Sequence, residues 1–304
     1  MLGAYMDTIP NGLSSARIIR KIRDKQKKHY HIIELDHCYV RYRMEGKGSH
    51  TLVFAADAPV NLEDYDTLIA HLKDQYRVVV MELPGFGFSL PKLSMSFRFD
   101  ASVDVLEEFL SHLNCPPYVL GFPCAAGYFA IRLADKNPSD ISHLVMLQTP
   151  DWQQEQCWKQ RLDPKNVISK PFVGQAIVRA RKNQIAHQWI EYSCQCEELT
   201  QQIQNNCSTN FGKGASYSLA SALQISLPPE QPLLNKVSQP SIAIYGKSDK
   251  SHRATDFNSI TQYFHNIRVF GLDGIGHLPE LEAPASVSQS IHSLLSPTGF
   301  SRTK

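Results

Sequence analysis

Short apolar runs alternate with amphipathic helical segments over residues 51–147, and this alternation limits the fold more than any other feature of the sequence. The run at residues 77–83 (RVVVMEL) is typical, because it is β-branched and too short for a helix. Runs that are apolar along their whole length are characteristic of strands buried on both faces of a sheet. The sequence therefore predicts an α/β fold with a mostly parallel, eight-stranded sheet and helices on both faces. We expect strands at residues 31–35, 39–44, 51–55, 77–83, 118–121, 141–147, 241–245 and 266–270, and helices at residues 62–72, 99–113, 126–134, 254–263 and 285–295.

The alternation stops between residues 149 and 238. This segment is rich in glutamine, shows helical spacing near residues 172–181, 185–192 and 217–223, and contains no convincing strand. The alternation then resumes, so the segment interrupts one sheet rather than linking two domains. We expect three parts: a basic N-terminal extension at residues 1–30, an α/β core at residues 31–150 and 238–304, and an inserted helical cap at residues 151–237.

Basic residues are concentrated near the N-terminus. Residues 17–28 hold seven basic residues and one aspartate, on a helical pattern with a thin apolar stripe of Ile18, Ile19 and Ile22. A helix docked on the protein surface and a helix in peripheral contact with a membrane both fit this pattern. The net charge of the chain is only +2, which provides no field that would attract nucleic acid. We therefore expect a small-molecule ligand and no nucleic-acid partner.

The seven cysteines indicate reduced thiols. Their odd number and wide spacing argue against a disulfide framework, and Cys194 and Cys196 lack a histidine at metal-ligand spacing. The sequence has no apolar run long enough to span a membrane and no apolar leader of the secretory type. These observations predict a cytoplasmic protein that needs no metal or cofactor.

Residues 118–138 (YVLGFPCAAGYFAIRLADKNP) combine a strand, a tight turn and a helix, with Cys124 at the turn. Three further stretches are residues 82–89 (ELPGFGFS), 246–249 (GKSD) and 276–284 (GHLPELEAP). Together they resemble the α/β-hydrolase superfamily, in which nucleophile, acid and histidine follow one another in this order. Cys124 stands where that superfamily usually has serine. The resemblance extends over most of the chain outside the first thirty residues and the cap.

The resemblance implies a triad of Cys124 as nucleophile, His277 as base and Asp249 as the acid that orients the base. Asp151, which follows the strand at residues 141–147, is an alternative acid. A thiolate attacks thioesters and activated esters readily, so we expect a hydrolase or acyltransferase, such as a thioesterase, with an apolar acyl substrate. As an ion-paired thiol at a helix N-terminus, Cys124 should have a pKa below the free value of about 8.5. Burial and the nearby Asp57 act in the opposite direction.

The same resemblance implies an oxyanion hole formed by the backbone N–H groups of Asp57 and Ala125, and a substrate pocket that includes Phe86, Phe122 and Trp152. Two positions depart from the superfamily's pattern. Phe122 stands where glycine is usual, and residues 55–57 (AAD) replace a His-Gly pair and its successor. These departures support a second hypothesis, a catalytically degraded α/β-hydrolase-fold protein that binds a small ligand or a protein partner. A homodimer is compatible with either hypothesis.

Overall fold

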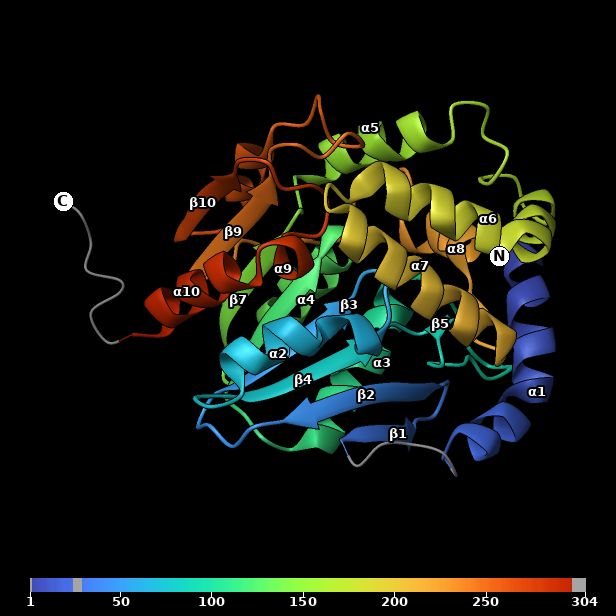
Figure 1. Ribbon diagram of the computed structural model, residues 1–304, viewed down its shortest axis with the longest axis horizontal. Coiled ribbons are helices and arrows are strands. Elements are labelled where there is room, and N and C mark those ends of the chain that lie inside the picture. The colour runs from blue at the N-terminus through green and yellow to red at the C-terminus, as the bar shows by residue number, and fades with distance from the viewer. Residues whose placement is uncertain (1, 24–28, 297–304) are drawn as a thin grey trace.

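Eight strands form one sheet in the computed structural model, which describes residues 2–23 and 29–296 (Figure 1). The strand order is β1-β2-β4-β3-β6-β7-β9-β10; pairing is antiparallel between β1, β2 and β4 and parallel from β4 to β10. The predicted mostly parallel, eight-stranded sheet is confirmed. The strands are β1 (Tyr30–Glu34), β2 (Tyr39–Glu45), β3 (Thr51–Ala56), β4 (Arg77–Glu82), β6 (Tyr118–Pro123), β7 (Ile141–Leu147), β9 (Ser241–Gly246) and β10 (Ile267–Leu272).

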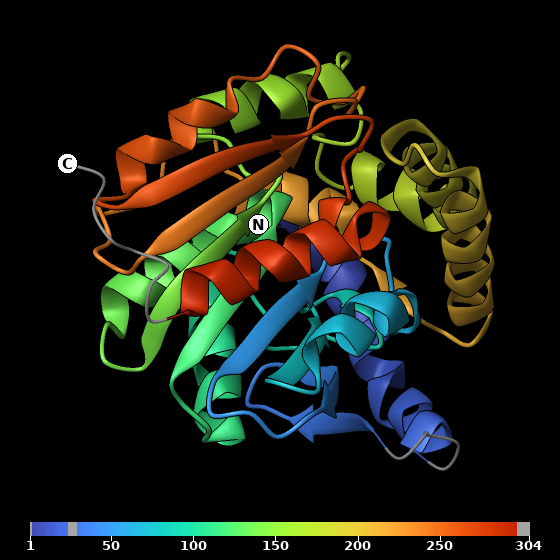
Figure 2. The same cartoon turned by 60° about the vertical axis from the view of Figure 1, so that its left-hand side comes forward.

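The central strands are buried on both faces, as their continuous apolar runs predict. Leu52 of β3 belongs to one hydrophobic cluster together with residues of α2 and α10, whereas its neighbour Val53 belongs to a second cluster with residues of α3 and α4. Successive side chains of a strand point to opposite faces, so two pairs of helices cover the sheet, as Figure 2 shows. One face carries α2 (Asp66–Leu72) and α10 (Pro284–Leu295), and the other carries α3 (Phe99–Leu113) and α4 (Gly127–Lys136). A short helix, α9 (Pro279–Glu282), precedes α10.

Two expected helices have a tighter backbone than predicted. The segment expected at residues 62–72 begins as a 3-10 turn, Leu62–Tyr65, before α2. The segment expected at residues 254–263 is a 3-10 helix, Phe257–Tyr263, whose N-cap Asp256 accepts a hydrogen bond from the Asn258 N–H. Both segments still bury apolar residues, so the hydrophobic spacing predicted a helical segment with a buried side but not the type of helix.

The chain between β7 and β9 is mainly helical. The expected helices at residues 172–181 and 185–192 are one helix, α6, which bends at Arg181, where the backbone is not helical. One short strand, β8, pairs with β5, so the expectation that residues 151–237 contain no strand was wrong. The elements are α5 (Trp152–Leu162), α6 (Val173–Ser193), α7 (Glu197–Gly212), β8 (Ser216–Tyr217), α8 (Leu219–Ser221) and a π-helical turn (Ala222–Ser226), with β5 at Phe86–Gly87.

The N-terminal helix α1 (Tyr5–Arg23) packs against β1 and α6 at the edge of the molecule (Figure 1). Ile19 is buried on its inner side. The side chain of Asn11 donates a hydrogen bond to Ser216 Oγ (2.9 Å), and Ser221 Oγ donates one to Asp7 (2.6 Å). The part of the basic run at residues 24–28 lies outside the described residues. None of the helices in the described part of the chain combines the length and apolar character that a bilayer crossing requires.

A buried carboxylate fixes the turn after β4. Glu82 accepts hydrogen bonds from the backbone N–H of Phe88 (2.7 Å) and from Arg41 Nη1 (2.9 Å). Gly87 has a φ of +54°, and a β-carbon there would lie 2.3 Å from the Glu82 carboxyl carbon. The turn therefore closes tightly around Glu82, and it carries Phe86 to the site described below.

Candidate active site

Cys124 lies at the tip of a tight turn between β6 and α4. Pro123 is still extended (φ −90°, ψ 157°), whereas Cys124 has a φ of +49°, a left-handed backbone conformation that is uncommon for residues other than glycine. Cys124 is thus the residue at the tip of the turn, and Pro123 still belongs to the strand. The turn needs space at Gly127, where a β-carbon would lie 2.4 Å from Thr149 Oγ1.

Phe122 does not obstruct this turn. Its side chain is buried in the cluster that lies between the sheet and α3 and α4. The close approach occurs instead at Gly121, where a β-carbon would lie 2.5 Å from the ring of Phe54. Phe122 is therefore accommodated because consecutive strand residues face opposite sides of the sheet.

His277 is buried, and its Nδ1 lies 2.7 Å from Asp249 Oδ2. Asp249 also accepts hydrogen bonds from Gln148 Nε2 (2.7 Å) and Ser251 Oγ (2.7 Å). Burial opposes the ionisation of Asp249, but the positive charge of His277 outweighs this effect and holds the pKa of Asp249 below its usual range. Asp249 is therefore placed to fix the imidazole ring and to balance a positive charge on it.

The alternative acid, Asp151, has another structural role. It is the N-cap of α5, where its Oδ1 accepts a hydrogen bond from the Gln154 N–H (2.8 Å). Its Oδ2 accepts one from Gln262 Nε2 (2.8 Å). Nδ1 of His277 faces Asp249 and not Asp151.

His252 is a further partner of Asp249 that the sequence analysis missed. Its Nδ1 lies 2.9 Å from Asp249 Oδ2, and its ring stacks on that of His277 with 5.1 Å between centroids. Burial lowers the pKa of His252 to about 4, so the ring is neutral near pH 7. Its position three residues after Asp249 was the only signal in the sequence.

Asp57 points into the site. Its Oδ2 lies 3.1 Å from Nε2 of His277, and the ligand atoms of Asp57, Cys124 and His277 lie within 4.8 Å of one another. Burial lowers the pKa of His277, but the charge of Asp249 and the hydrogen bonds to both aspartates raise the pKa well above its ordinary value. The imidazole is thus held in its protonated form between two carboxylates.

Glu155, which the sequence analysis also missed, is fully buried beside Cys124. Its Oε1 lies 3.8 Å from Cys124 Sγ, and its Oε2 has no hydrogen-bond partner among the described residues. Burial, and to a smaller extent the charge of Asp57, raise the pKa of Glu155 to about 8, so its carboxyl group is protonated at pH 7. The signal was the spacing of Trp152, Glu155 and Trp158, which puts a glutamate on the buried side of α5.

The pKa of the Cys124 thiol is raised, which is opposite to the sequence-based expectation. Burial is the main cause, and the charges of Glu155 and Asp57 add to it; His277 acts against both. The turn at Cys124–Ala126 is a 3-10 segment that precedes α4. The helix N-terminus and the imidazolium therefore do not overcome the loss of solvent and the two acidic neighbours.

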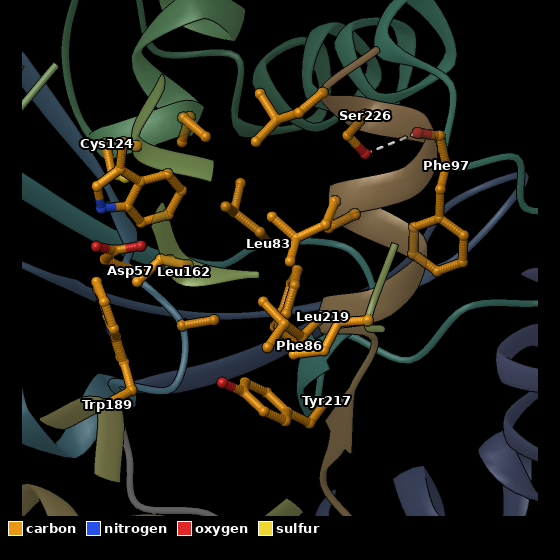
Figure 3. Close-up of a pocket in the computed structure, with 18 of the residues that line it drawn as sticks. Asp57, Leu83, Phe86, Phe97, Cys124, Leu162, Trp189, Tyr217, Leu219 and Ser226 are labelled. Atoms are coloured by element: carbon orange, nitrogen blue, oxygen red, sulfur yellow. Dashed lines mark hydrogen bonds between the residues drawn. The ribbon is translucent and has the colours of Figure 1, made fainter. Parts of the chain in front are cut away.

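Cys124, Ala125, Asp57 and His277 line an apolar cavity of about 400 Å³. Figure 3 shows Cys124 and Asp57 at one side of it, with Leu83, Phe86 and Leu219 beyond them. Ser226 faces its far side, where its Oγ donates a hydrogen bond to the Phe97 carbonyl (2.7 Å). The wall also includes Phe97, Phe129, Trp158, Trp189, Tyr217 and Leu223.

Of the three aromatic residues expected in the pocket, Phe86 lines this cavity, whereas Phe122 and Trp152 lie in the hydrophobic core. The indole of Trp152 packs edge-on against the ring of Tyr128, with 4.9 Å between centroids. Trp158, six residues later in α5, lines the cavity instead. The first residue of α5 thus packs in the core, and a later buried residue of the same helix lines the cavity.

The model of the family described as "alpha/beta hydrolase fold" matches residues 54–284. The chain belongs to the α/β-hydrolase fold family. The match includes Asp57, Cys124, Asp249 and His277, while α1 lies outside it.

Individual relatives of this α/β-hydrolase-fold protein are distant. An uncharacterized hydrolase of Saccharomyces cerevisiae is 31% identical over 121 residues, which are 38% of this chain and 41% of that protein. The crystal structure of a Bacillus megaterium epoxide hydrolase with an inhibitor has a TM-score of 0.68 at 18% identity, covering 87% of this chain and 99% of that one. A thermophilic esterase of Thermogutta terrifontis has a TM-score of 0.63 at 20% identity, covering 87% and 98%. At these identities the structural likeness concerns the fold.

Among residues 2–23 and 29–296 of this α/β-hydrolase-fold protein, two groups bring donor atoms close enough for metal coordination. They are Asp57, Cys124 and His277, and Asp249, His252 and His277. In both groups His277 is already hydrogen-bonded to a carboxylate, at 3.1 Å and 2.7 Å. An ion in either group would therefore have to replace the proton of that hydrogen bond.

Proposed function

We propose that the protein is a hydrolase or acyltransferase for an ester or thioester of an apolar acyl group, with Cys124 as nucleophile, His277 as base and Asp249 as the orienting acid. The observation that carries the proposal is the left-handed turn at Cys124, which directs a thiol toward His277 at the wall of an apolar cavity. The hydrogen bond between His277 and Asp249 supports it, because such a pair orients a catalytic base.

The reaction follows from the positions of these groups. In the reactive form His277 has first lost a proton to solvent and then accepts the thiol proton, so that a thiolate and an imidazolium lie side by side. The thiolate adds to the substrate carbonyl, His277 gives its proton to the leaving group, and the acyl group remains on Cys124 as a thioester. Water or another acceptor then gives a proton to His277 and attacks this thioester, which releases the acyl product and restores the thiolate.

The oxyanion formed in both steps needs hydrogen-bond donors. The N–H groups of Asp57 and Ala125 remain our proposed oxyanion hole, since both residues line the cavity beside Cys124. We assign a third donor to Glu155: its protonated carboxyl group lies against Cys124 Sγ, and its Oε2 has no hydrogen-bond partner in the described part of the chain. A neutral acid can donate to an oxyanion without repelling it.

The cavity indicates the substrate class. Its volume of about 400 Å³ lies within the range of small-molecule sites, and its wall is largely aliphatic and aromatic. Residues 151–237 contribute Trp158, Trp189 and Leu219 to this wall, which supports their role as a cap. We therefore propose an apolar acyl chain as the part of the substrate that the cap covers. The relatives described as an epoxide hydrolase and an esterase fit a small molecule with a reactive carbon–oxygen bond.

One observation favours a second candidate function, a protein that binds a small ligand without turning it over. Asp57 occupies the nitrogen of His277 that would receive the thiol proton. If this hydrogen bond persists when a ligand enters, Cys124 remains a thiol and the cavity is only a binding site. The two candidates differ in whether Cys124 becomes acylated.

The test is intact-protein mass spectrometry after mixing the full chain with p-nitrophenyl butyrate or a butyryl thioester, together with release of the leaving group. We expect an acyl adduct on wild type and on Cys157→Ala, which removes an exposed thiol, and no adduct on Cys124→Ala. His277→Ala should slow acylation about a hundredfold or more. Hydrolysis that persists unchanged in Cys124→Ala would overturn the proposal, and ligand binding without any adduct in wild type would favour the second candidate.

A further inference from the structure

The outer face of α1 exposes large apolar side chains. Tyr5, Ile9 and Leu13 are 54%, 46% and 75% exposed and are four residues apart. Residues at this spacing lie on one side of a helix. Leu93 is 53% exposed and widens the surface, because a β-carbon at Gly12 would lie 3.0 Å from its side chain.

The same side of α1 continues as a row of cations. Arg17, Arg20 and Lys21 are exposed, and no ion pair within the described ranges 2–23 and 29–296 includes them. Arg23 is also exposed, but its Nη2 donates a hydrogen bond to the Ile32 carbonyl of β1 (3.2 Å). The acidic residue of this helix, Asp7, faces inward to Ser221. The N-terminal half of the exposed face is therefore apolar and the C-terminal half is positively charged.

The helix is anchored so that this face stays outward. Thr8, Ser15 and Ile19 are buried on the opposite side, and Asn11 is hydrogen-bonded to Ser216. The surface thus exists in the folded protein and needs no ordering when it meets a partner. The described part of the basic run, residues 17–23, thus adjoins the exposed apolar residues before it in one preformed surface.

We propose that this surface, defined by Tyr5, Ile9, Leu13, Arg17 and Arg20, binds an anionic phospholipid bilayer. Apolar side chains enter the interfacial region of a bilayer, and Arg and Lys side chains bind phosphate headgroups. Charge complementarity selects an anionic lipid surface, because Arg17, Arg20 and Lys21 have no ion-pair partner in the part of the chain that the structure describes. The apolar cavity is consistent with this location, since a substrate with an apolar acyl chain partitions into bilayers, although the proposal does not depend on catalysis.

The test is co-sedimentation of the full chain with extruded vesicles of phosphatidylcholine, with and without about 30 mol % phosphatidylglycerol. We expect binding to the anionic vesicles, weakened by raising the salt to about 0.5 M. Arg17→Glu with Arg20→Glu, and separately Ile9→Ser with Leu13→Ser, should each lower the partition coefficient about tenfold or more. All four residues are exposed, so we expect both double variants to fold, and thermal unfolding checks this.

Matched controls lie elsewhere on the surface. Lys47→Glu with Lys236→Glu makes the same change in net charge at two exposed lysines, and Leu233→Ser removes a leucine that is 61% exposed. Both should bind vesicles as wild type does.

Equal binding to neutral and anionic vesicles, or an equal loss in the controls, would overturn the proposal. A dimer in light scattering that dissociates in the Ile9/Leu13 variant would also overturn it, because the surface would then join two copies of the chain. Loss of hydrolysis without loss of vesicle binding would bear only on the proposed function.

Discussion

Asp57 Oδ2 lies 3.1 Å from Nε2 of His277, the nitrogen that faces away from Asp249. A buried imidazole with a carboxylate at each nitrogen is stabilised in its protonated form. The carboxylate of Asp57 also disfavours a thiolate at Cys124. The same residue therefore engages the base and holds the nucleophile in its unreactive form, which makes Asp57 the most informative position in the site.

Asp57→Asn should make Cys124 more reactive at pH 7. Loss of the charge lowers the pKa of the thiol and weakens the hydrogen bond at Nε2 of His277, and each unit of pKa changes the thiolate fraction about tenfold. We expect alkylation of Cys124 by iodoacetamide to accelerate about tenfold or more, measured by peptide mass spectrometry against the exposed Cys157. The control is Asp151→Asn, which keeps an N-cap on α5 and changes a side chain that is hydrogen-bonded to neither Cys124 nor His277. An unchanged rate in Asp57→Asn would show that Asp57 does not restrain the thiol.

The reactivity of Cys124 in wild type should rise with pH. Its pKa is raised by burial and by Glu155 and Asp57, so the thiolate fraction increases about tenfold per pH unit from neutral to alkaline conditions. We expect alkylation at pH 6 to be slower than at Cys157, and His277→Ala to slow it further, because the positive charge that favours the thiolate is lost. A reaction rate that reaches its plateau below pH 8 would contradict this expectation.

Glu155→Gln should separate neutral from alkaline behaviour. The carboxyl group, with a pKa of about 8, is protonated below pH 7, and glutamine also donates a hydrogen bond, so we expect hydrolysis near pH 6 to change little. Above pH 8 the wild-type carboxylate opposes the oxyanion and the thiolate, and the variant should be the faster enzyme. Glu155→Ala, which has no donor, should be slower than wild type near pH 6, where the wild-type carboxyl group donates.

The same group predicts a pH-dependent difference in stability. A carboxyl group whose pKa is raised on folding binds its proton more tightly in the folded state, so its contribution to stability is lost as pH rises from its unfolded value toward 8. The free energy of unfolding of wild type should therefore fall relative to Glu155→Gln between pH 5 and 9, measured by urea denaturation. Parallel pH profiles for the two proteins would contradict the raised pKa.

Local patterns predicted most of the fold. The helix Phe99–Leu113 and the strand Ile141–Leu147 have the bounds expected from their hydrophobic spacing, because each packs an apolar side against the core. The helices α5 and α7 were not predicted, since their sequences are polar and bury only a few residues each. The strand β8 is two residues long and depends on its partner β5, which comes from a distant part of the chain.

The same distinction applies to the site. The turn at Cys124 and the contact between Asp249 and His277 could be predicted because short motifs specify them. The inward direction of Asp57 and the burial of Glu155 depend on how β3 and α5 meet, which a single sequence does not state. The sign of the thiol pKa shift was wrong for this reason: burial and acidic neighbours come from tertiary structure, whereas the helix N-terminus that would lower the pKa is visible locally.

The turn after β4 provides a test of stability away from the reacting groups. Arg41 and Glu82 are both buried, and Glu82 also holds the Phe88 N–H. Glu82→Ala should lower the free energy of unfolding by about 3–5 kcal/mol, because it leaves a buried guanidinium without this partner and opens the turn. Urea denaturation measures the loss, and Asp273→Ala is the control: its pair with Lys247 is exposed, so its removal should cost less than about 1 kcal/mol. Glu82→Gln keeps the acceptor for the Phe88 N–H but loses the charge, so its effect should fall between the two. A loss in Glu82→Ala no larger than in Asp273→Ala would mean that Glu63, the other acidic partner of Arg41, is sufficient to satisfy the buried arginine.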